Sequence, residues 1–142
     1  MAKKSKQEEV EDVKNQLKRA LADYSNLQKR FAEEKKYLLK YANASLILKL
    51  LSVLDFLEAA GRHLQDEGLD LSIKKYKETL RTEGVVEIAP TGKKFDPNFH
   101  EAVEVVEGKE DGKIVKVLQK GYTLDDKVLR PAKVKVSKKQ NA

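Results

Sequence analysis

A heptad repeat of apolar side chains in the first third of the sequence constrains the fold more than any other feature. The apolar positions are alternately three and four residues apart, and only Glu34 and Ser45 break the series Val10, Val13, Leu17, Ala20, Tyr24, Leu27, Phe31, Leu38, Tyr41 and Leu48. This spacing predicts a coiled-coil helix. One helix over about residues 7–51 would be roughly 70 Å long, more than a domain of this size can cover with its own residues. We therefore expect this helix to pair with a second copy of the chain.

The apolar pattern widens after residue 45. In the stretch SLILKLLSVLDFL, apolar side chains cover more of a helix than a two-stranded seam can bury. A second amphipathic stretch, LDLSIKKYKETLRTEG, ends at Gly84, a favourable residue for a helix C-terminus. Two such segments from each of two chains predict a four-helix bundle at the dimer axis. The expected dimer interface is Val10, Val13, Leu17, Tyr24, Leu27, Phe31, Leu38, Tyr41, Leu48, Leu51, Leu54, Leu57, Leu69, Ile73 and Leu80.

The composition changes at Gly84. Five of the seven glycines lie from Gly84 onward, together with all three prolines and clusters of valine. In RPAKVKVSK, Ala132, Val134 and Val136 alternate with lysines, which predicts a strand with one buried face. The predicted fold class is α+β. Residues 1–83 would form the long helix and the dimerisation bundle, and residues 84–142 a small antiparallel β-domain.

The sequence contains no recognisable set of catalytic residues. It has no cysteine, so thiolate metal sites and disulfides are excluded. His63 and His100 stand apart from each other, and no glycine-rich loop precedes a helix in the way that phosphate binding requires. For either histidine a structural or surface role is favoured over a catalytic one. We therefore expect a protein that is not an enzyme and that uses no cofactor and no metal.

The charge pattern indicates which partners to expect. The formal net charge of +6 hints at an anionic partner, but basic and acidic residues are interleaved and no aromatic platform is present, which argues against nucleic acid. The longest apolar run is short and is broken by Lys49 and Asp55, so neither a signal peptide nor a membrane span is predicted. The absence of cysteine fits a reducing cytoplasm.

Three motifs follow one another in the C-terminal part of the chain. They are FDPNFHEAV at residues 95–103, VLQKGY at 117–122 and VLRPA at 128–132, and upstream stand ADYSNLQKRF and LLSVLDFLE. Over residues 15–139 the sequence resembles the GrpE family, nucleotide exchange factors of DnaK-type heat-shock chaperones. The resemblance implies a parallel homodimer with a long paired helix, a four-helix bundle and two β-domains that project as wings.

The resemblance also implies a mechanism and a binding site. A wing would bind the ATPase domain of the chaperone and favour its open nucleotide cleft, so that ADP leaves. Lys127 matches a basic family position that faces the chaperone, and the QKGY turn is expected to be exposed. The partner-binding residues expected in this way are Phe95, Pro97, His100, Gln119, Lys120, Gly121, Tyr122, Lys127, Leu129, Arg130, Pro131 and Val136.

Several of these residues also have a structural interpretation. Gly121 is expected to permit a turn with positive φ, and Tyr122 and Phe95 could form the core of the small domain. Val136 is a core residue by alternation, and the Arg130 guanidinium could brace the β-domain internally. A surface lysine at position 127 has little structural reason to be there, so contact with the chaperone and simple solvation are weighed about evenly.

The sequence departs from the family in the bundle. Ser52 stands where the family usually has proline, and the connection between Asp55 and Gly68 is short. We therefore expect a smaller bundle whose first helix is more continuous with the long helix.

Two other kinds of function remain open from the sequence. A coiled-coil scaffold could present a β-domain that binds a partner without exchange activity, and it would form a dimer that leaves nucleotide release unchanged. A nucleic-acid binder would lose affinity steeply with salt. Unfolded protein is kept as a further partner of the exchange factor.

Overall fold

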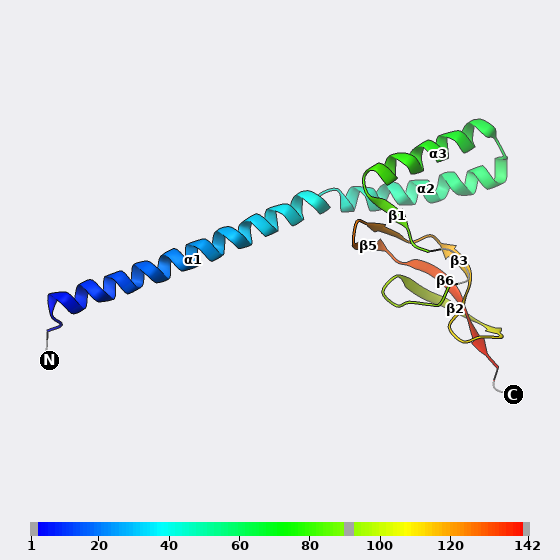
Figure 1. Cartoon of the computed structure of the whole chain (residues 1–142). Helices are drawn as coiled ribbons and strands as arrows, with labels where there is room; N and C mark the ends of the chain where they lie inside the picture. Colours follow the sequence, from blue (N-terminus) through cyan, green and yellow to red (C-terminus); the bar gives the residue numbers. More distant parts are fainter. Residues whose placement is uncertain (1–2, 90–92, 141–142) are drawn as a thin grey trace. The chain divides into compact units, whose positions relative to one another are not determined.

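The computed structural model describes residues 3–89 and 93–140 (Figure 1). The chain divides into two compact units, Met1–Ala42 and Asn43–Ala142. The first unit is helical, and the second contains a helical hairpin followed by strands. The predicted α+β class is confirmed.

Helix α1 (Lys6–Tyr41) makes up the first unit. Ser5 caps its N-terminus in a capping box, because the Ser5 hydroxyl accepts from the Glu8 N–H and the Glu8 carboxylate accepts from the Ser5 N–H. The helix has no buried residue. Its apolar stripe is therefore uncovered within the described chain.

The helix does not continue to residue 51 as the heptad pattern predicted, and that prediction is wrong. Helix α1 ends at Tyr41, and helix α2 (Ala44–Leu64) begins three residues later. Asn43 precedes α2 with φ −89° and ψ −1°, at the edge of the helical region. Asparagine is a common residue at helix ends, but the Asn43 side chain makes no capping hydrogen bond here. By contrast, α2 runs through Ser52 without interruption, as expected for a chain without proline there.

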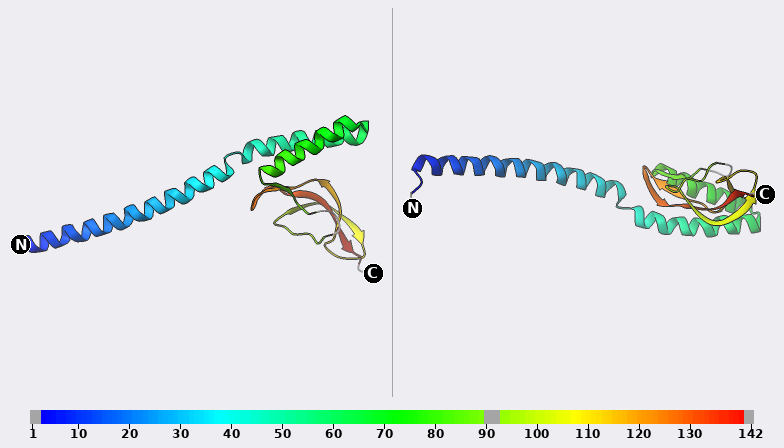
Figure 2. Two further views of the ribbon diagram at one scale, coloured as in Figure 1. Left: turned by 45° about the horizontal axis from the view of Figure 1, so that its top comes forward. Right: turned by 90° about the horizontal axis from the view of Figure 1, so that it is seen from below.

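Helices α2 and α3 (Glu67–Thr82) form an antiparallel hairpin and lie side by side in each view (Figure 2). Gln65 makes the turn in the left-handed region at φ 51°, and the Asp66 carboxylate caps α3 by accepting from the Leu69 N–H at 2.8 Å. A Cβ atom on Gly61 would lie 2.9 Å from the Ile73 side chain, so glycine allows the helices to approach closely. The buried apolar side chains of the hairpin are Ile47, Leu51, Leu54, Ile73 and Leu80.

Gly84 ends α3 as predicted. Its φ is 88°, and its N–H donates to the Arg81 carbonyl at 3.0 Å. Strand β1 (Val85–Glu87) follows directly and pairs antiparallel with β4 (Tyr122–Leu124), which pairs antiparallel with β5 (Lys127–Arg130).

The predicted small β-domain is present, and its strand pairs are antiparallel except one in the second sheet, which is mixed. Strand β6 (Ala132–Lys139) lies between β2 (His100–Gly108) and β3 (Ile114–Gln119), parallel to β2 and antiparallel to β3. Two consecutive strands are thus separated by a strand from later in the chain. The core of this domain consists of Ile88, Ile114, Ala132, Val134 and Val136. The alternation predicted for residues 132–136 is confirmed.

Candidate functional site

The three sequence motifs of the C-terminal part meet in space. The Ala132 N–H, in the motif VLRPA, donates to the Phe99 carbonyl of FDPNFHEAV at 3.0 Å. The Gly121 carbonyl of VLQKGY accepts from the Ile88 N–H at 2.8 Å. A Cβ atom on Gly121 would lie 2.2 Å from the Ala132 nitrogen. Motifs that are separate in sequence therefore interlock through the backbone.

The motif FDPNFH forms the turn that leads into β2. The Asp96 carboxylate accepts from the Asn98 N–H, and the Asp96 carbonyl accepts from the N–H groups of Phe99 and His100. His100 is buried, and its Nδ1 accepts from the Asp96 N–H at 3.0 Å. The proton of the neutral ring therefore lies on Nε2. His100 closes this turn, which is the structural role favoured over catalysis for that residue.

Gly121 is required for close packing and not for its φ angle. The glycines with positive φ in the described chain are Gly84 and Gly112. The expected positive φ at Gly121 is therefore wrong. What excludes a side chain is the backbone of Pro131 and Ala132, which a Cβ atom would overlap.

The QKGY turn packs against helix α2 of the same chain, so the prediction that it is exposed is wrong. Gly121 and Tyr122 are buried, and Gln119 and Lys120 are half-buried. The Gln119 amide donates to the Asp55 carboxylate at 3.4 Å, and the Lys120 ammonium donates to the Glu58 carboxylate at 3.0 Å. The turn is held by two acidic side chains of α2.

Arg130 strengthens the same junction. Its guanidinium donates two hydrogen bonds to the Asp55 carboxylate, at 2.6 and 2.7 Å, while its Nε donates to the Lys120 carbonyl at 2.8 Å. The guanidinium also lies over the ring of Tyr122, 5.4 Å from the centroid. The Arg130 side chain is 12% exposed. The internal bracing considered for Arg130 is present, and it extends to α2.

Glu58 is the most buried carboxylate at this junction, 9% exposed, and forms ion pairs with Lys77 of α3 and Lys120. Burial alone raises the pKa of Glu58, but hydrogen bonds and charge from the two lysines outweigh burial and hold the pKa below its usual value. Burial lowers the pKa of Lys120, and Glu58 and Glu87 outweigh it, so the net shift is upward. Both side chains are charged at neutral pH.

Tyr122 is a core residue of the small domain. It is 5% exposed, and its hydroxyl has no hydrogen-bond partner among the described residues. Burial raises the pKa of Tyr122, and the negative charges of Glu58 and Glu87 raise it further. The side chain is therefore a neutral phenol.

The expected partner-binding residues differ widely in exposure. Pro97 and Lys127 are exposed, and Lys127 opens β5 opposite Leu124. The half-buried members of the set are Phe95, Gln119, Lys120, Leu129, Arg130 and Pro131, and the buried members are His100, Gly121, Tyr122 and Val136. The buried members build the domain, and the exposed members have side chains that a partner can reach.

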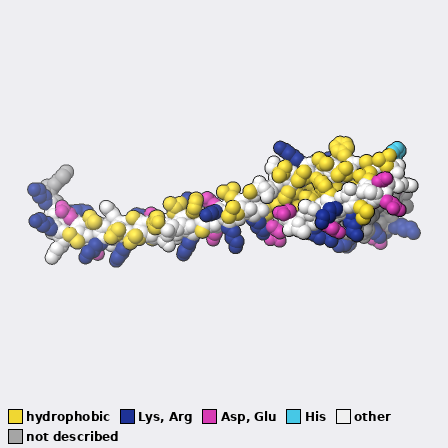
Figure 3. Space-filling view, turned by 90° about the horizontal axis from the view of Figure 1, so that it is seen from above, with side chains coloured by type: hydrophobic (Ala, Val, Ile, Leu, Met, Phe, Trp, Pro, Cys, Tyr) yellow, Lys and Arg dark blue, Asp and Glu magenta, His cyan; other side chains and the backbone are white. Residues whose placement is uncertain are grey.

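The apolar residues expected at a dimer interface fall into two groups. Leu51 and Leu54 are fully buried, and Ile73 and Leu80 are nearly so, which leaves them almost no surface for another chain. The stripe on α1 is exposed, from 50% at Leu27 to 66% at Leu38. Leu48 is 38% exposed, and Tyr41, Leu57 and Leu69 are half-buried. Hydrophobic side chains line α1 and gather over the helical hairpin in Figure 3.

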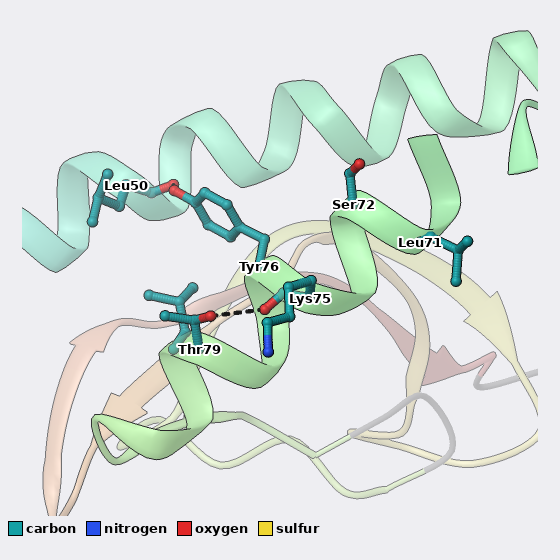
Figure 4. Close-up of a pocket in the computed structure, with 7 residues that line it drawn as sticks. Leu50, Leu71, Ser72, Lys75, Tyr76 and Thr79 are labelled. Atoms are coloured by element: carbon teal, nitrogen blue, oxygen red, sulfur yellow. Dashed lines mark hydrogen bonds between the residues drawn. The ribbon is translucent and has the colours of Figure 1, made fainter. Parts of the chain in front are cut away.

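The hairpin also carries an open apolar groove of about 570 Å³. Figure 4 shows Tyr76 of α3 reaching across to α2, where its hydroxyl donates to the Leu50 carbonyl at 2.9 Å. The groove is lined by Leu50, Leu71, Ser72, Lys75, Tyr76, Thr79 and Leu80. Within this set Leu71 is 67% exposed. Such a surface is of the kind that a second pair of helices covers in a four-helix bundle.

Two further properties concern the described part of the chain. Among these residues no group of three or more His, Cys, Asp or Glu side chains is arranged to hold a metal ion. In the same residues no helix combines the length and apolar character needed to cross a membrane.

Sequence reasoning missed Asp55, Glu58 and Lys77 as members of the site. The available signal was a pair of carboxylates three residues apart in an otherwise apolar stretch, LLSVLDFLEAAG. Carboxylates on the apolar face of a helix are costly unless they are paired, so this pair could have indicated basic partners. The sequence alone did not show which basic residues, many positions away, pair with these carboxylates.

Comparison with known proteins decides the family. The GrpE family model matches residues 2–138. The chain belongs to the GrpE family. The Protein GrpE of Methanosphaera stadtmanae is 43% identical over 137 residues, which cover 92% of this chain and 79% of that protein. The Protein GrpE of Clostridioides difficile is 40% identical over 145 residues, covering 96% of this chain and 70% of that protein.

A third relative, the Protein GrpE of Methanothrix thermoacetophila, is 42% identical over 140 residues, which cover 92% of this chain and 78% of that protein. The matches include both the helical part and the β-domain. The resemblance identified from the three motifs is confirmed, and GrpE is a family of co-chaperones.

Proposed function

We propose that the protein is a homodimeric co-chaperone that binds a DnaK-type chaperone in the cytoplasm and promotes ADP release. The observation that carries the proposal is the GrpE family match over residues 2–138, which includes β1 to β5 and all but the last residue of β6. In this proposal residues 1–83 form the dimer, and residues 84–142 form a wing that binds the ATPase domain of the chaperone. ADP release in this proposal makes and breaks no covalent bond.

The uncovered helix surfaces support the dimer. The α1 stripe has a heptad spacing, and none of its residues is buried by the rest of the described chain. A heptad seam is covered by another heptad seam, so a second copy is the simplest occupant. The groove beside Tyr76 adds apolar surface on the hairpin, and the matching hairpin of a second chain would cover it.

The mechanism follows from linkage. Suppose that a wing binds the open nucleotide cleft better than the closed cleft. The wing then lowers the affinity of the chaperone for ADP, and ADP lowers the affinity of the chaperone for the wing by the same factor. A thousandfold weakening requires about 4 kcal/mol of preference for the open state. A modest protein interface can supply that difference.

Calorimetric titration of the chaperone's ATPase domain, without nucleotide and with saturating ADP, tests the proposal. We expect tight binding without nucleotide and much weaker binding with ADP. A coiled-coil scaffold that only presents the β-domain would bind equally in both conditions or not at all, and either result would reject nucleotide exchange.

A further inference from the structure

Charged side chains form part of the connection between the β-domain and the helices. Strand β1 follows α3 directly, and β5 faces α2. Where β5 faces α2, the carboxylates of Asp55 and Glu58 form ion pairs with Arg130, Lys120 and Lys77. We call these five residues the ion-pair cluster. The cluster joins α2, α3, the turn before β4 and the end of β5.

The geometry of the ion-pair cluster is directional. Asp55 and Glu58 are three residues apart and therefore lie on the same face of α2. The Arg130 guanidinium binds both oxygens of Asp55, a fork that fixes orientation as well as distance. The third Arg130 donor, Nε, holds the Lys120 carbonyl at 2.8 Å, which couples the two basic residues.

The β-domain has a core of its own that does not include this cluster. Ile114 is 1% exposed and Val134 is fully buried, and both belong to the mixed sheet. Loss of the two carboxylates would therefore leave the inside of the wing intact. The desolvation of buried charges offsets much of their attraction, so a partly buried ion pair adds little net stability, and in some proteins such pairs specify geometry.

We propose that Asp55 and Glu58 are positioning residues, which hold the wing at one orientation on the helical hairpin so that it meets the chaperone productively. This proposal rests on the proposed exchange function. Without the two carboxylate charges the wing remains folded but samples several orientations about the α3–β1 connection. If only a fraction of these orientations is competent, the apparent dissociation constant rises by the inverse of that fraction.

A distance measurement inside one chain tests the positioning without a chaperone. The chain contains no cysteine, so spin labels can be placed on His63→Cys of α2 and Lys109→Cys of the β-domain, both exposed positions. Labelled chains are diluted with unlabelled chains, so that each distance comes from one protomer. We expect a narrow distance distribution in the parent protein and a clearly broader one in Asp55→Asn/Glu58→Gln. Equal widths would overturn the proposal.

The functional arm uses the unlabelled full chain and a matched control. Glu11→Gln/Glu67→Gln removes the same number of charges at exposed positions of α1 and α3. For Asp55→Asn/Glu58→Gln we expect the concentration that half-saturates ADP release to rise about threefold or more, with an unchanged maximal rate. The control should match the parent. A broader distance distribution with unchanged half-saturation would also overturn the proposal.

The distance measurement and the ADP-release assay together distinguish a failure of this proposal from a failure of the proposed exchange function. If the parent protein fails to accelerate ADP release, the exchange function is rejected, and with it the role of the cluster in exchange. The distance arm still decides whether Asp55 and Glu58 fix the wing. If the parent protein is active, failure of either arm for the double variant rejects only the positioning.

Discussion

The backbone of Gly121 passes so close to the backbone of Ala132 that a Cβ atom on residue 121 would lie 2.2 Å from the Ala132 nitrogen. That nitrogen donates to the Phe99 carbonyl, so Gly121→Ala would disturb two motifs at once. We expect a loss of about 1–3 kcal/mol in the free energy of unfolding, measured by urea denaturation. Gly68→Ala is the milder comparison, because its Cβ atom would lie 3.2 Å from the Asp66 Oδ1 that caps α3, an atom of a side chain that can shift, whereas at Gly121 it would meet backbone. A Gly121→Ala variant as stable as the parent would contradict this packing.

The seam of α1 gives a prediction about assembly. Leu27→Glu/Phe31→Glu places two charges on the apolar stripe, and we expect the dimer to dissociate, because a coiled-coil seam does not accommodate unpaired charges. Ser25→Glu/Asn26→Glu adds the same charge at exposed positions off the stripe and should remain dimeric. Sedimentation equilibrium at micromolar concentration measures both. A monomeric parent protein would reject the dimer.

Lys127 gives a prediction about the chaperone. It is exposed at the start of β5, and Lys127→Ala should leave helicity and dimerisation unchanged. Loss of a charged contact of about 1–3 kcal/mol corresponds to roughly five- to 150-fold weaker binding of the ATPase domain. Calorimetry measures this, with Lys109→Ala as the control on the same domain. Unchanged affinity in a folded dimer would remove Lys127 from the binding site.

Glu58 makes stability depend on pH in a defined direction. The groups that act on it are Lys77 of α3 and Lys120, with Glu87 of β1 and Asp55 of α2 nearby. Because the folded-state pKa of Glu58 is lowered, its stabilisation is present above the unfolded pKa of about 4.3 and is lost as pH falls through the folded pKa.

We therefore expect Glu58→Gln to be less stable than the parent by about 1–3 kcal/mol at pH 7. The difference should shrink below about pH 4, because the parent carboxylate then becomes neutral too. Urea denaturation at several pH values checks this. A difference that stays constant from pH 7 to pH 3 would mean that the charge of Glu58 is not what stabilises the junction.

Local patterns predicted the elements better than their assembly. The heptad spacing predicted α1, and the alternation at Ala132, Val134 and Val136 predicted β6, because both patterns reflect which face of an element is buried. The break at Asn43 carried neither proline nor glycine, so nothing strong marked it. The parallel pairing of β2 with β6 and the contact of Arg130 with Asp55 join residues far apart in sequence. Single-chain periodicity contains no information about such pairings.

In the candidate site, too, the sequence predicted the elements but not how they pack. The motifs located the wing, but they did not distinguish residues that build it, such as Tyr122 and His100, from residues that a partner can reach, such as Lys127 and Pro97. That distinction depends on burial, which the sequence indicates only where strands alternate regularly. The QKGY turn lies outside such a pattern, and its polar start concealed that it packs on α2.

Stopped-flow release of a fluorescent ADP analogue from a DnaK-type chaperone, with and without this protein, tests nucleotide exchange directly. We expect ADP release to accelerate as the protein is added and then to saturate, and we expect Lys127→Ala to require a higher concentration for the same effect. A release rate that stays at the chaperone's intrinsic value, while the protein is a folded dimer, would show that the protein is not a nucleotide exchange factor for that chaperone.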